Sequence, residues 1–598
     1  MLAILLDSVE VIAFDPVSVA GNDPSVQLSV LGTHRGGIFS RNSPTFPVYD
    51  PVTQRLFTGS VDRLRLDALD ISDPSNPTPV LTDKFGLAGE LGPNRIAMYD
   101  GVIAVSTENS SVAFFNALGT QLGSPVSVPG ARELAFSPDG QKLVVTVSGE
   151  EVIPGTIQDS SVSIFDFSGE DWNACQTLGG CDLGLNPTIS TASFTGLNSQ
   201  RQQLLDNGVR LPFTSFPYSR TVAQDLEPGP VTVKGNSAWI SFVDNNAIME
   251  VDLNTSQVVN IFGLGAKDNS LTDNGFQDTT NSLPVGLPGG GVRSNGFDAS
   301  DRDGAINIQT WPMKTFYEPD SIDTFMAGGQ TFLVTANEGD PRKSFTGVET
   351  SERLKDISGL LGPNPIDPLN PVFSLQGDSQ LGRLKVSAVD GDTDNDGDID
   401  ELYSFGTRSF SIWSDSGDLV FDSGDDFEQI TAHVLPEFFN APEDENSFDN
   451  RSDDRGPEPE VLDVGMIGEK SYVFVGFERI GGIMVYDVTD PSEVRFEQYI
   501  NNRNFDIDIR SVCGVGGEKG TPEGPSCSQV GDLEPEGLLF ISADDSPNGI
   551  PLLAVSHELS DSITLYQIDS LGEIPEPSSI ILCVVGLLLF VSGRSKYV

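Results

Sequence analysis

The chain has 598 residues and a formal net charge of −53, from 87 acidic and 34 basic side chains. Such a surface repels nucleic acid and anionic membranes, because binding to phosphate requires clustered lysine and arginine. A hydrophobic content of 38% excludes disorder throughout. The charge is instead expected to attract divalent cations or cationic partners.

Residues 1–25 form an N-terminal segment in front of the predicted folded domain. An exported protein needs a leader with a basic start and an apolar run. The opening MLAILLDSVEVIAFD has a short apolar run, no basic residue and then Asp7. Either the start codon is misplaced and the leader is missing, or the chain is not exported; we favour the first.

Between residues 26 and 569, short apolar strands alternate with turns, and no long stretch shows the 3.6-residue period of a helix. A repeat runs through this region. An acidic residue and a proline precede a strand, a glycine-containing turn follows, and a strongly apolar strand ends at an acidic residue. Together with weaker copies nearer the N-terminus, these units predict an all-β fold, a closed β-propeller of about seven four-stranded blades. The clearest copies begin at Glu227-Pro228, Glu318-Pro319, Glu458-Pro459 and Glu534-Pro535.

Long inserted loops are expected between the blades, because a minimal blade needs only ~40–45 residues. One insertion is placed at about 170–226, which is rich in Asn, Thr and Ser. The other is placed at about 340–457, which holds most of the charged and proline-rich material.

The five cysteines form two close pairs and one tail residue, Cys583. Disulfides Cys175–Cys181 and Cys513–Cys527 would fit an oxidising compartment. Zinc is the weaker alternative, since neither pair has CxxC spacing. Only three histidines occur in the chain, which argues against a histidine-built metal centre.

The sharpest local motif is an acidic loop, DGDTDNDGDIDE, at 390–401. Alternate carboxylates can converge on one Ca²⁺, Gly397 permits the sharp bend, and Ile399 would anchor the loop in the core. Tyr403 stands where a full EF-hand has its bidentate glutamate, so we expect a shortened, structural calcium loop. The alternative is a solvated acidic turn. The predicted metal ligands are Asp392, Asp394, Asp396, Asp398 and Asp400.

A second constellation comes from the repeated acids, because equivalent positions of successive propeller blades converge at the central channel. One set precedes the repeat prolines, at Glu227, Glu318, Glu458 and Glu534, and another ends the apolar strands, at Glu338, Glu478 and Glu558. Converging carboxylates would need bound cations or raised pKa values. The alternative is that each glutamate caps backbone N–H groups of a repeated turn.

The C-terminus combines a linker at 570–579, containing Pro575-Glu576-Pro577, with an apolar segment and basic end at 580–598. The apolar run, residues 580–591, would form a short helix of roughly 18 Å, less than the ~30 Å of a hydrocarbon core. This tail resembles the PEP-CTERM sorting signal, which exosortase-type enzymes of Gram-negative bacteria recognise and remove. The resemblance implies export, transient attachment to the membrane through the C-terminal segment, and a cell-surface or extracellular location.

The chain as a whole resembles the choice-of-anchor I family, over about residues 26–570. The resemblance rests on LVTANEGDPR, DGDTDNDGDIDELYSFGTRSFSIW, RSDDRGPEPE, FVGFERIGGIMVYDVTDP and DLEPEGLLFIS. It implies a surface β-propeller, and some relatives are named alkaline phosphatases. This chain departs from the pattern in its first blade, which reads PTFPVYD at 44–50 where relatives have an acidic residue, at Asp244, where Glu is usual, and at Val461, where Gly is expected.

The sequence therefore predicts an exported, calcium-binding β-propeller that binds a ligand such as a cell-surface polymer, or has a structural role at the surface. The alternative is a calcium-dependent phosphoester hydrolase, resembling alkaline phosphatase or phytase. Its glutamates would hold cations that activate water, and an arginine would clamp the phosphate. A scaffold for protein partners is a third hypothesis. The candidate catalytic residues of the hydrolase are Glu458, Glu460, Glu534, Glu536, Arg408 and Arg479.

Overall fold

The structure is a computed structural model. The residues that it describes are 14–39, 46–60, 64–80, 93–107, 110–149, 157–169, 187–214, 219–287, 291–342, 350–357, 366–394, 396–513, 521–522 and 527–571.

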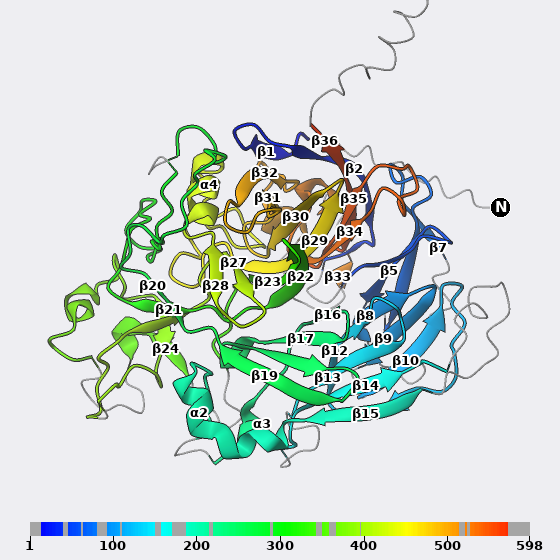
Figure 1. The fold of residues 1–598 in the computed structure, drawn as a ribbon. Coiled ribbons are helices and arrows are strands. Elements are labelled where there is room, and N and C mark those ends of the chain that lie inside the picture. The colour runs from blue at the N-terminus through cyan, green and yellow to red at the C-terminus, as the bar shows by residue number, and fades with distance from the viewer. Residues whose placement is uncertain are drawn as a thin grey trace, which may run out of the picture.

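Within these residues, six four-stranded sheets and one five-stranded sheet form a ring of blades (Figure 1). The strands of each blade are antiparallel, and the innermost strands, which line the central cavity, are β4, β8, β12, β16, β22, β29 and β34. This confirms the predicted all-β propeller of about seven blades. Blade 1 consists of β4 (Val48–Asp50), β5 (Arg55–Ser60), β6 (Arg65–Asp70) and β7 (Thr78–Val80), and blade 2 consists of β8 (Pro93–Tyr99), β9 (Val102–Thr107), β10 (Ser111–Asn116) and β11 (Val126–Ser127). Blade 3 consists of β12 (Ala131–Phe136), β13 (Lys142–Val147), β14 (Ser161–Asp166) and β15 (Thr188–Ser193), and blade 4 consists of β16 (Val231–Lys234), β17 (Ser237–Phe242), β18 (Ala247–Asp252) and β19 (Gln257–Gly263).

Blades 5 to 7 complete the ring, and two of them take a strand from the N-terminus. Blade 5 consists of β22 (Ser321–Ala327), β23 (Gln330–Ala336), β27 (Phe410–Ser414) and β28 (Leu419–Asp422). Blade 6 consists of β29 (Pro459–Ile467), β30 (Lys470–Phe477), β31 (Ile483–Asp487), β32 (Arg495–Asn501) and β1 (Val17–Ala20). Blade 7 consists of β34 (Pro535–Ile541), β35 (Leu552–His557), β36 (Ser562–Ser570) and β2 (Val26–Arg35).

The hydrophobic core lies between the blades. Each pair of neighbouring blades shares one cluster of buried side chains, as where Phe114 of blade 2 packs beside Phe165 of blade 3. The cluster of Leu56, Leu69, Ile541 and Leu552 joins blade 1 to blade 7 and closes the ring. The middle strands are buried on both faces, which explains their nearly continuous apolar sequences.

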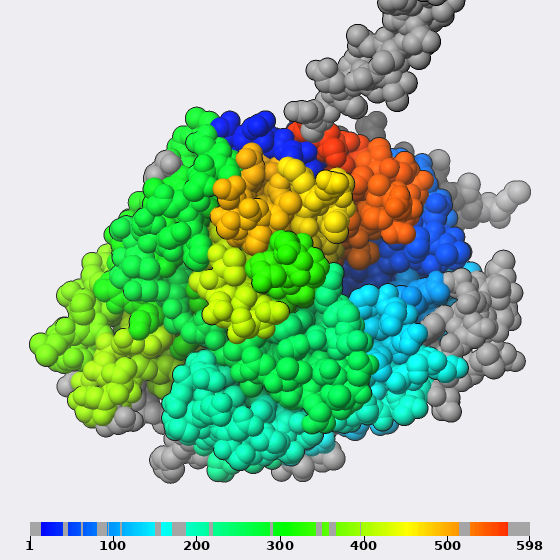
Figure 2. Space-filling model, in the orientation of Figure 1, coloured from blue at the N-terminus to red at the C-terminus, as the bar shows by residue number. Residues whose placement is uncertain are grey.

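The N-terminal strands fasten the two last blades. Strand β2 pairs with β36 as the outer strand of blade 7, and β1 pairs with β32 at the outside of blade 6. Figure 2 shows this blue N-terminal segment beside the red end of the described chain. Residues 17–20, which we expected to precede the domain, therefore belong to the propeller.

The insertions differ from their predicted limits, because strands of the ring lie inside them. Segment 170–226 contains β15, and segment 340–457 contains β27 and β28. The segments inserted between the blades pack beside the ring around a separate hydrophobic core (Figure 1). The elements outside the seven blades are β3 (Ile38–Phe39), β20 (Ala266–Asp268), β21 (Lys314–Phe316), β24 (Ser351–Arg353), β25 (Lys385–Ser387), β26 (Tyr403–Phe405), β33 (Thr521–Pro522), α2 (Arg201–Asp206), α3 (Val222–Asp225), α4 (Asp426–Val434), α5 (Ile509–Cys513), and the 3-10 helices η1 (Phe194–Gln200), η2 (Val243–Asn245), η3 (Leu354–Asp356), η4 (Pro371–Leu375) and η5 (Cys527–Val530).

One predicted disulfide is present, between Cys513 and Cys527 in the segment between blades 6 and 7. The other predicted pair, Cys175 and Cys181, lies outside the described residues, as do the Pro-Glu-Pro linker and the apolar tail with Cys583.

Candidate functional site

A cavity of about 710 Å³ opens where the first strands of the blades converge around the central channel. Its walls are strongly acidic, with ten carboxylates against four arginines. The charged lining residues are Arg95, Arg132, Glu133, Glu227, Asp244, Asp320, Glu338, Asp340, Arg455, Glu460, Glu478, Arg479, Glu536 and Glu558.

β-Bulges direct two of these acids into the cavity. In blade 6, the pairing with β30 jumps from Pro459 to Val461, so Glu460 is the extra residue of a bulge. In blade 7, the pairing with β35 jumps over Glu536 in the same way. A bulge re-aims a side chain and leaves its residue outside the ladder. The same bulge in two blades therefore directs equivalent carboxylates into the same space.

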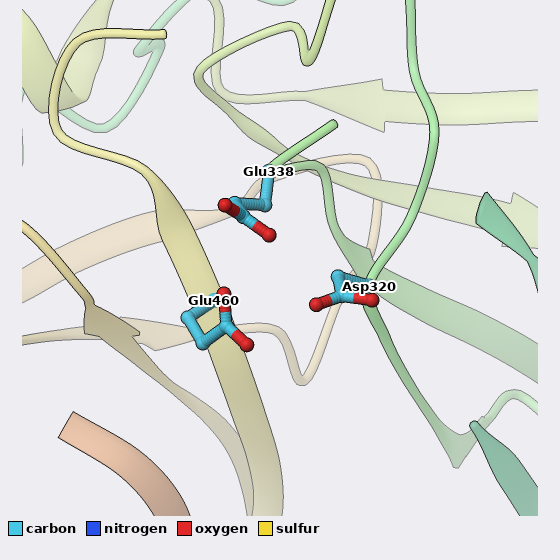
Figure 3. A group of neighbouring side chains, drawn as sticks. All are labelled: Asp320, Glu338 and Glu460. Atoms are coloured by element: carbon cyan, nitrogen blue, oxygen red, sulfur yellow. The ribbon is translucent and has the colours of Figure 1, made fainter. Parts of the chain in front are cut away.

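Three carboxylates meet closely on the wall formed by blades 5 and 6. Asp320 comes directly before β22, Glu338 follows β23, and Glu460 lies on β29. One oxygen of each lies within 4.8 Å of the others, and the side chains point toward one another (Figure 3). Three oxygens so close, carried by neighbouring blades, could hold a hard cation such as Ca²⁺.

Burial raises the pKa values of three acids of the cavity, Glu338, Glu460 and Glu536. Burial raises the pKa of Glu338 to about 8, against the opposing effect of Arg455. Burial also raises the pKa of Glu460 well above its usual value, helped by the carboxylates of Glu338 and Asp320. Across the cavity, burial raises the pKa of Glu536 to about 7. Without a cation, these groups would retain protons near neutral pH.

Glu458 has a different environment, although it lies only two residues from Glu460. Its side chain is completely buried. Arg451 Nε donates to Oε1 at 2.9 Å, while Arg455 Nη2 and Arg479 Nε each lie 2.9 Å from Oε2. Although burial alone would raise it, these three guanidiniums hold the pKa of Glu458 well below its usual value. Glu458 therefore fixes Arg455 and Arg479 of the cavity wall, and one of its oxygens also lies within 4.8 Å of oxygens of Glu338 and Glu478.

The other acids that precede a repeat proline are also bound to the protein. Glu318 is buried against Arg210 Nη1 at 3.0 Å, and Glu227 pairs with Arg342. Glu534 is 2% exposed. The backbone carbonyls of Glu458 and Glu534 accept the N–H groups of Glu478 and Glu558. Backbone groups therefore join these strand ends of a blade, whereas the side chains of Glu227 and Glu318 pair with arginines.

The predicted calcium loop lies outside the cavity, in the inserted segment. Oxygens of Asp392, Asp394 and Asp400 lie within 4.8 Å of one another. Gly397 has φ +100°, which favours glycine, and Ile399 is completely buried. Asp396 and Asp398 belong to the same turn. The loop backbone donates to Asp392 and Asp400, so these acids are held close together.

Arg408 does not line the cavity. Its guanidinium is buried, with Nη1 2.6 Å from Glu428 Oε1, and it stacks on Phe297. An electrophilic role for Arg408 beside Glu458 or Glu534 therefore does not fit its position. Arg479 does line the cavity, with Nη1 2.6 Å from Glu478.

Several charged cavity residues are not among the candidates predicted from the sequence, and Asp320, Arg95 and Glu133 are three of them. Asp320 follows Glu318-Pro319 as Glu460 follows Glu458-Pro459, so the repeat itself carried this signal. Arg95 and Glu133, 2.9 Å apart on β8 and β12, lie in blades whose sequences lack the glutamate–proline start. Nothing in the local sequence distinguishes them from surface residues.

The fold and the cavity define a β-propeller with an acidic centre. Residues 45–491 match the choice-of-anchor I domain, so the chain belongs to that family. The family and the propeller together indicate a surface-associated protein. Among the described residues, no helix has the length and apolar character needed to cross a membrane.

Two curated proteins are similar to parts of the chain. Gigasin-3a of Magallana gigas is 32% identical over 212 residues, which is 34% of this chain and 70% of that protein. The mesenchyme-specific cell surface glycoprotein of Strongylocentrotus purpuratus is 31% identical over 225 residues, 32% of this chain and 28% of its own length. Among solved structures, the Pan2 WD40 domain of Neurospora crassa has a TM-score of 0.41 and 7% identity, covering 93% of this chain and 99% of that one.

Proposed function

We propose that this protein is an exported surface propeller that binds Ca²⁺ in its central cavity and, through it, an anionic ligand such as a cell-surface polymer. The observation that supports this most directly is the meeting of Asp320, Glu338 and Glu460 at the cavity wall. A set of oxygen donors alone suits Ca²⁺ or Mg²⁺ better than zinc. The bound ion would offer its remaining coordination positions to a ligand in the cavity.

A second calcium ion is proposed in the loop of Asp392, Asp394 and Asp400, with a structural role. The loop is linked to the ring through Asp390, because Arg210 Nη2 lies 2.9 Å from Asp390 and Nη1 lies 3.0 Å from Glu318. An ion here would stiffen the insertion beside blade 5. Export is proposed to end with removal of the Pro-Glu-Pro tail by an exosortase-type enzyme.

Calcium binding is tested by titration calorimetry on the purified chain without its tail, after treatment with a chelator. We expect the double variant Glu338→Gln, Glu460→Gln to lose the cavity ion, while the exposed control Glu493→Gln keeps it. Unchanged calcium stoichiometry in the double variant would exclude the cavity site. The variant Asp392→Asn, Asp394→Asn reports separately on the loop.

A calcium-dependent phosphoester hydrolase is the second candidate, because Arg455 and Arg479 stand among the same carboxylates. Guanidinium groups recognise phosphate oxygens, and a bound cation would neutralise phosphate charge and activate water. Hydrolysis of an aryl phosphate, with calcium and with a chelator, separates the two functions. Calcium-dependent turnover that Glu460→Gln abolishes would establish the enzyme, and no turnover with retained calcium would favour the binding function.

A further inference from the structure

A group of three buried acids and one buried amide lies away from the cavity, among the inserted segments. It joins the loop at 297–307, helix α4 and the loop at 438–454. None of its members lines the cavity. The group consists of Asp298, Glu428, Asn440 and Asp449, whose exposed fractions are 0%, 2%, 0% and 2%.

Most oxygens of this buried group have donors. Both oxygens of Asp298 accept backbone N–H groups, from Ser300 at 3.2 Å and Asn307 at 2.6 Å. Glu428 Oε2 accepts the N–H of Asp298 at 2.8 Å. Glu428 Oε1 accepts Arg408 Nη1 at 2.6 Å and Asn440 Nδ2 at 3.0 Å.

Two oxygens are left over, on adjacent side chains. Asp449 Oδ2 and Asn440 Oδ1 are buried and have no hydrogen-bond partner in the structure. The two groups share Ser452, whose Oγ donates to Asp449 Oδ1 and accepts from Asn440 Nδ2 at 2.8 Å. An unsatisfied buried acceptor costs about 1–3 kcal/mol. We therefore expect a cation or a hydrogen-bond donor beside these two oxygens.

The net negative charge of the buried group also favours a bound cation. Of the three carboxylates, those of Asp298, Glu428 and Asp449, only Glu428 forms an ion pair in the described part of the chain, with the guanidinium of Arg408. The formal sum is three negative charges and one positive charge, which leaves −2 in a buried space. Burying unpaired charge of this size is costly, so a cation is expected to balance the group.

We propose that Asp449 and Asn440, supported by the carboxylates of Asp298 and Glu428, hold a buried calcium ion. Carboxylate and amide oxygens are calcium ligands, and an irregular set from three chain segments suits its flexible coordination better than that of Mg²⁺. The ion would fix the loop that carries Arg451 and Arg455, the two partners of Glu458. Arg408 already holds this loop, since its Nη2 donates to the carbonyl of Ser452 at 2.8 Å.

The test uses a background variant that lacks the two other candidate calcium sites. It carries Asp392→Asn, Asp394→Asn, Glu338→Gln and Glu460→Gln. After equilibration with calcium and gel filtration, elemental analysis is expected to find one calcium per chain. Adding Asp449→Asn should remove that ion, whereas Asp418→Asn, at an exposed turn, should not.

No calcium in the background variant would overturn the proposal, as would calcium that persists after Asp449→Asn. Circular dichroism checks that Asp449→Asn is folded. If it is not, the melting temperature of the background variant decides, because a chelator should lower it and an unchanged value would overturn the proposal. If the proposed cavity site did not bind calcium in the wild-type chain, these outcomes would not change, because the background variant lacks that site.

Discussion

The raised pKa of Glu338 has a defined consequence for stability in the absence of calcium. Burial moves this pKa from 4.5 to about 8, so the folded chain binds more protons than the unfolded chain across that interval. Stability should therefore fall as pH rises from about 4.5 to about 8 when a chelator is present. Calcium should raise the melting temperature more at pH 8 than at pH 5, because the ion then competes with fewer protons.

Melting curves at both pH values, with calcium and with a chelator, check this sign. Glu338→Gln should give a flatter pH dependence with the chelator, while the exposed control Glu493→Gln should retain the wild-type slope. A calcium effect of equal size at pH 5 and pH 8 would contradict the assignment of the ion to these carboxylates.

Glu458 gives the largest expected effect of a single side chain. Its replacement by glutamine leaves Arg451, Arg455 and Arg479 without their shared carboxylate. Removing one partner of a buried ion pair costs about 3–5 kcal/mol. Urea unfolding of Glu458→Gln should show a loss of this size, and a loss below about 1 kcal/mol would mean that the cluster is solvated.

The roles of Glu458 and Glu460 could not be separated from the sequence. Alternation along a strand places residues two apart on the same face, so both acids were expected at the channel. Glu458 instead has φ +55°, a left-handed conformation, and Glu460 is the bulge residue. Both departures arise from strand pairing, and the local sequence does not encode them in a recognisable way. The arginine partners of Glu458 could not be predicted from the sequence either, because Arg451 and Arg455 come from an insertion.

At the scale of elements, the outer strand β2 should decide whether the ring stays closed. Val26 and Leu28 of β2 are each 1% exposed. Burial of two such side chains contributes about 3–6 kcal/mol. A chain beginning at residue 36 should therefore lose at least this much stability, measured by chemical denaturation. A chain beginning at residue 22 loses only β1 and should be affected less; equal losses would contradict closure by β2.

The sequence predicted the regular elements better than the connections. A blade's second strand is buried on both faces, so continuous apolar runs such as LLAVSH and YVFVGF identified the blades. Blade 5 was divided incorrectly, because β23 and β27 pair across 73 intervening residues, 337–409. Pairing over such a distance leaves no local signal. The 340–457 segment therefore looked like one insertion although two strands of the ring lie within it.

At the scale of the whole molecule, the acidic charge acts on every site at once. A net charge of −53 destabilises the compact state by self-repulsion. Monovalent salt screens this repulsion, since the Debye length falls from about 10 Å at 0.1 M to about 3 Å at 1 M. Calcium bound at the proposed sites would act differently, because it would neutralise carboxylates that lie too close together for added salt to screen fully.

These two contributions can be separated by melting the chain in sodium chloride and in calcium chloride at matched ionic strength. Sodium chloride should raise the melting temperature gradually and without saturation. Calcium should add a further rise that saturates at low concentration, because specific binding to the folded state stabilises it as RT ln(1 + [L]/Kd). The background variant without cavity and loop carboxylates should keep the sodium response and lose most of the calcium response. Identical curves for the two salts would mean that calcium acts on this propeller only as part of the ionic atmosphere.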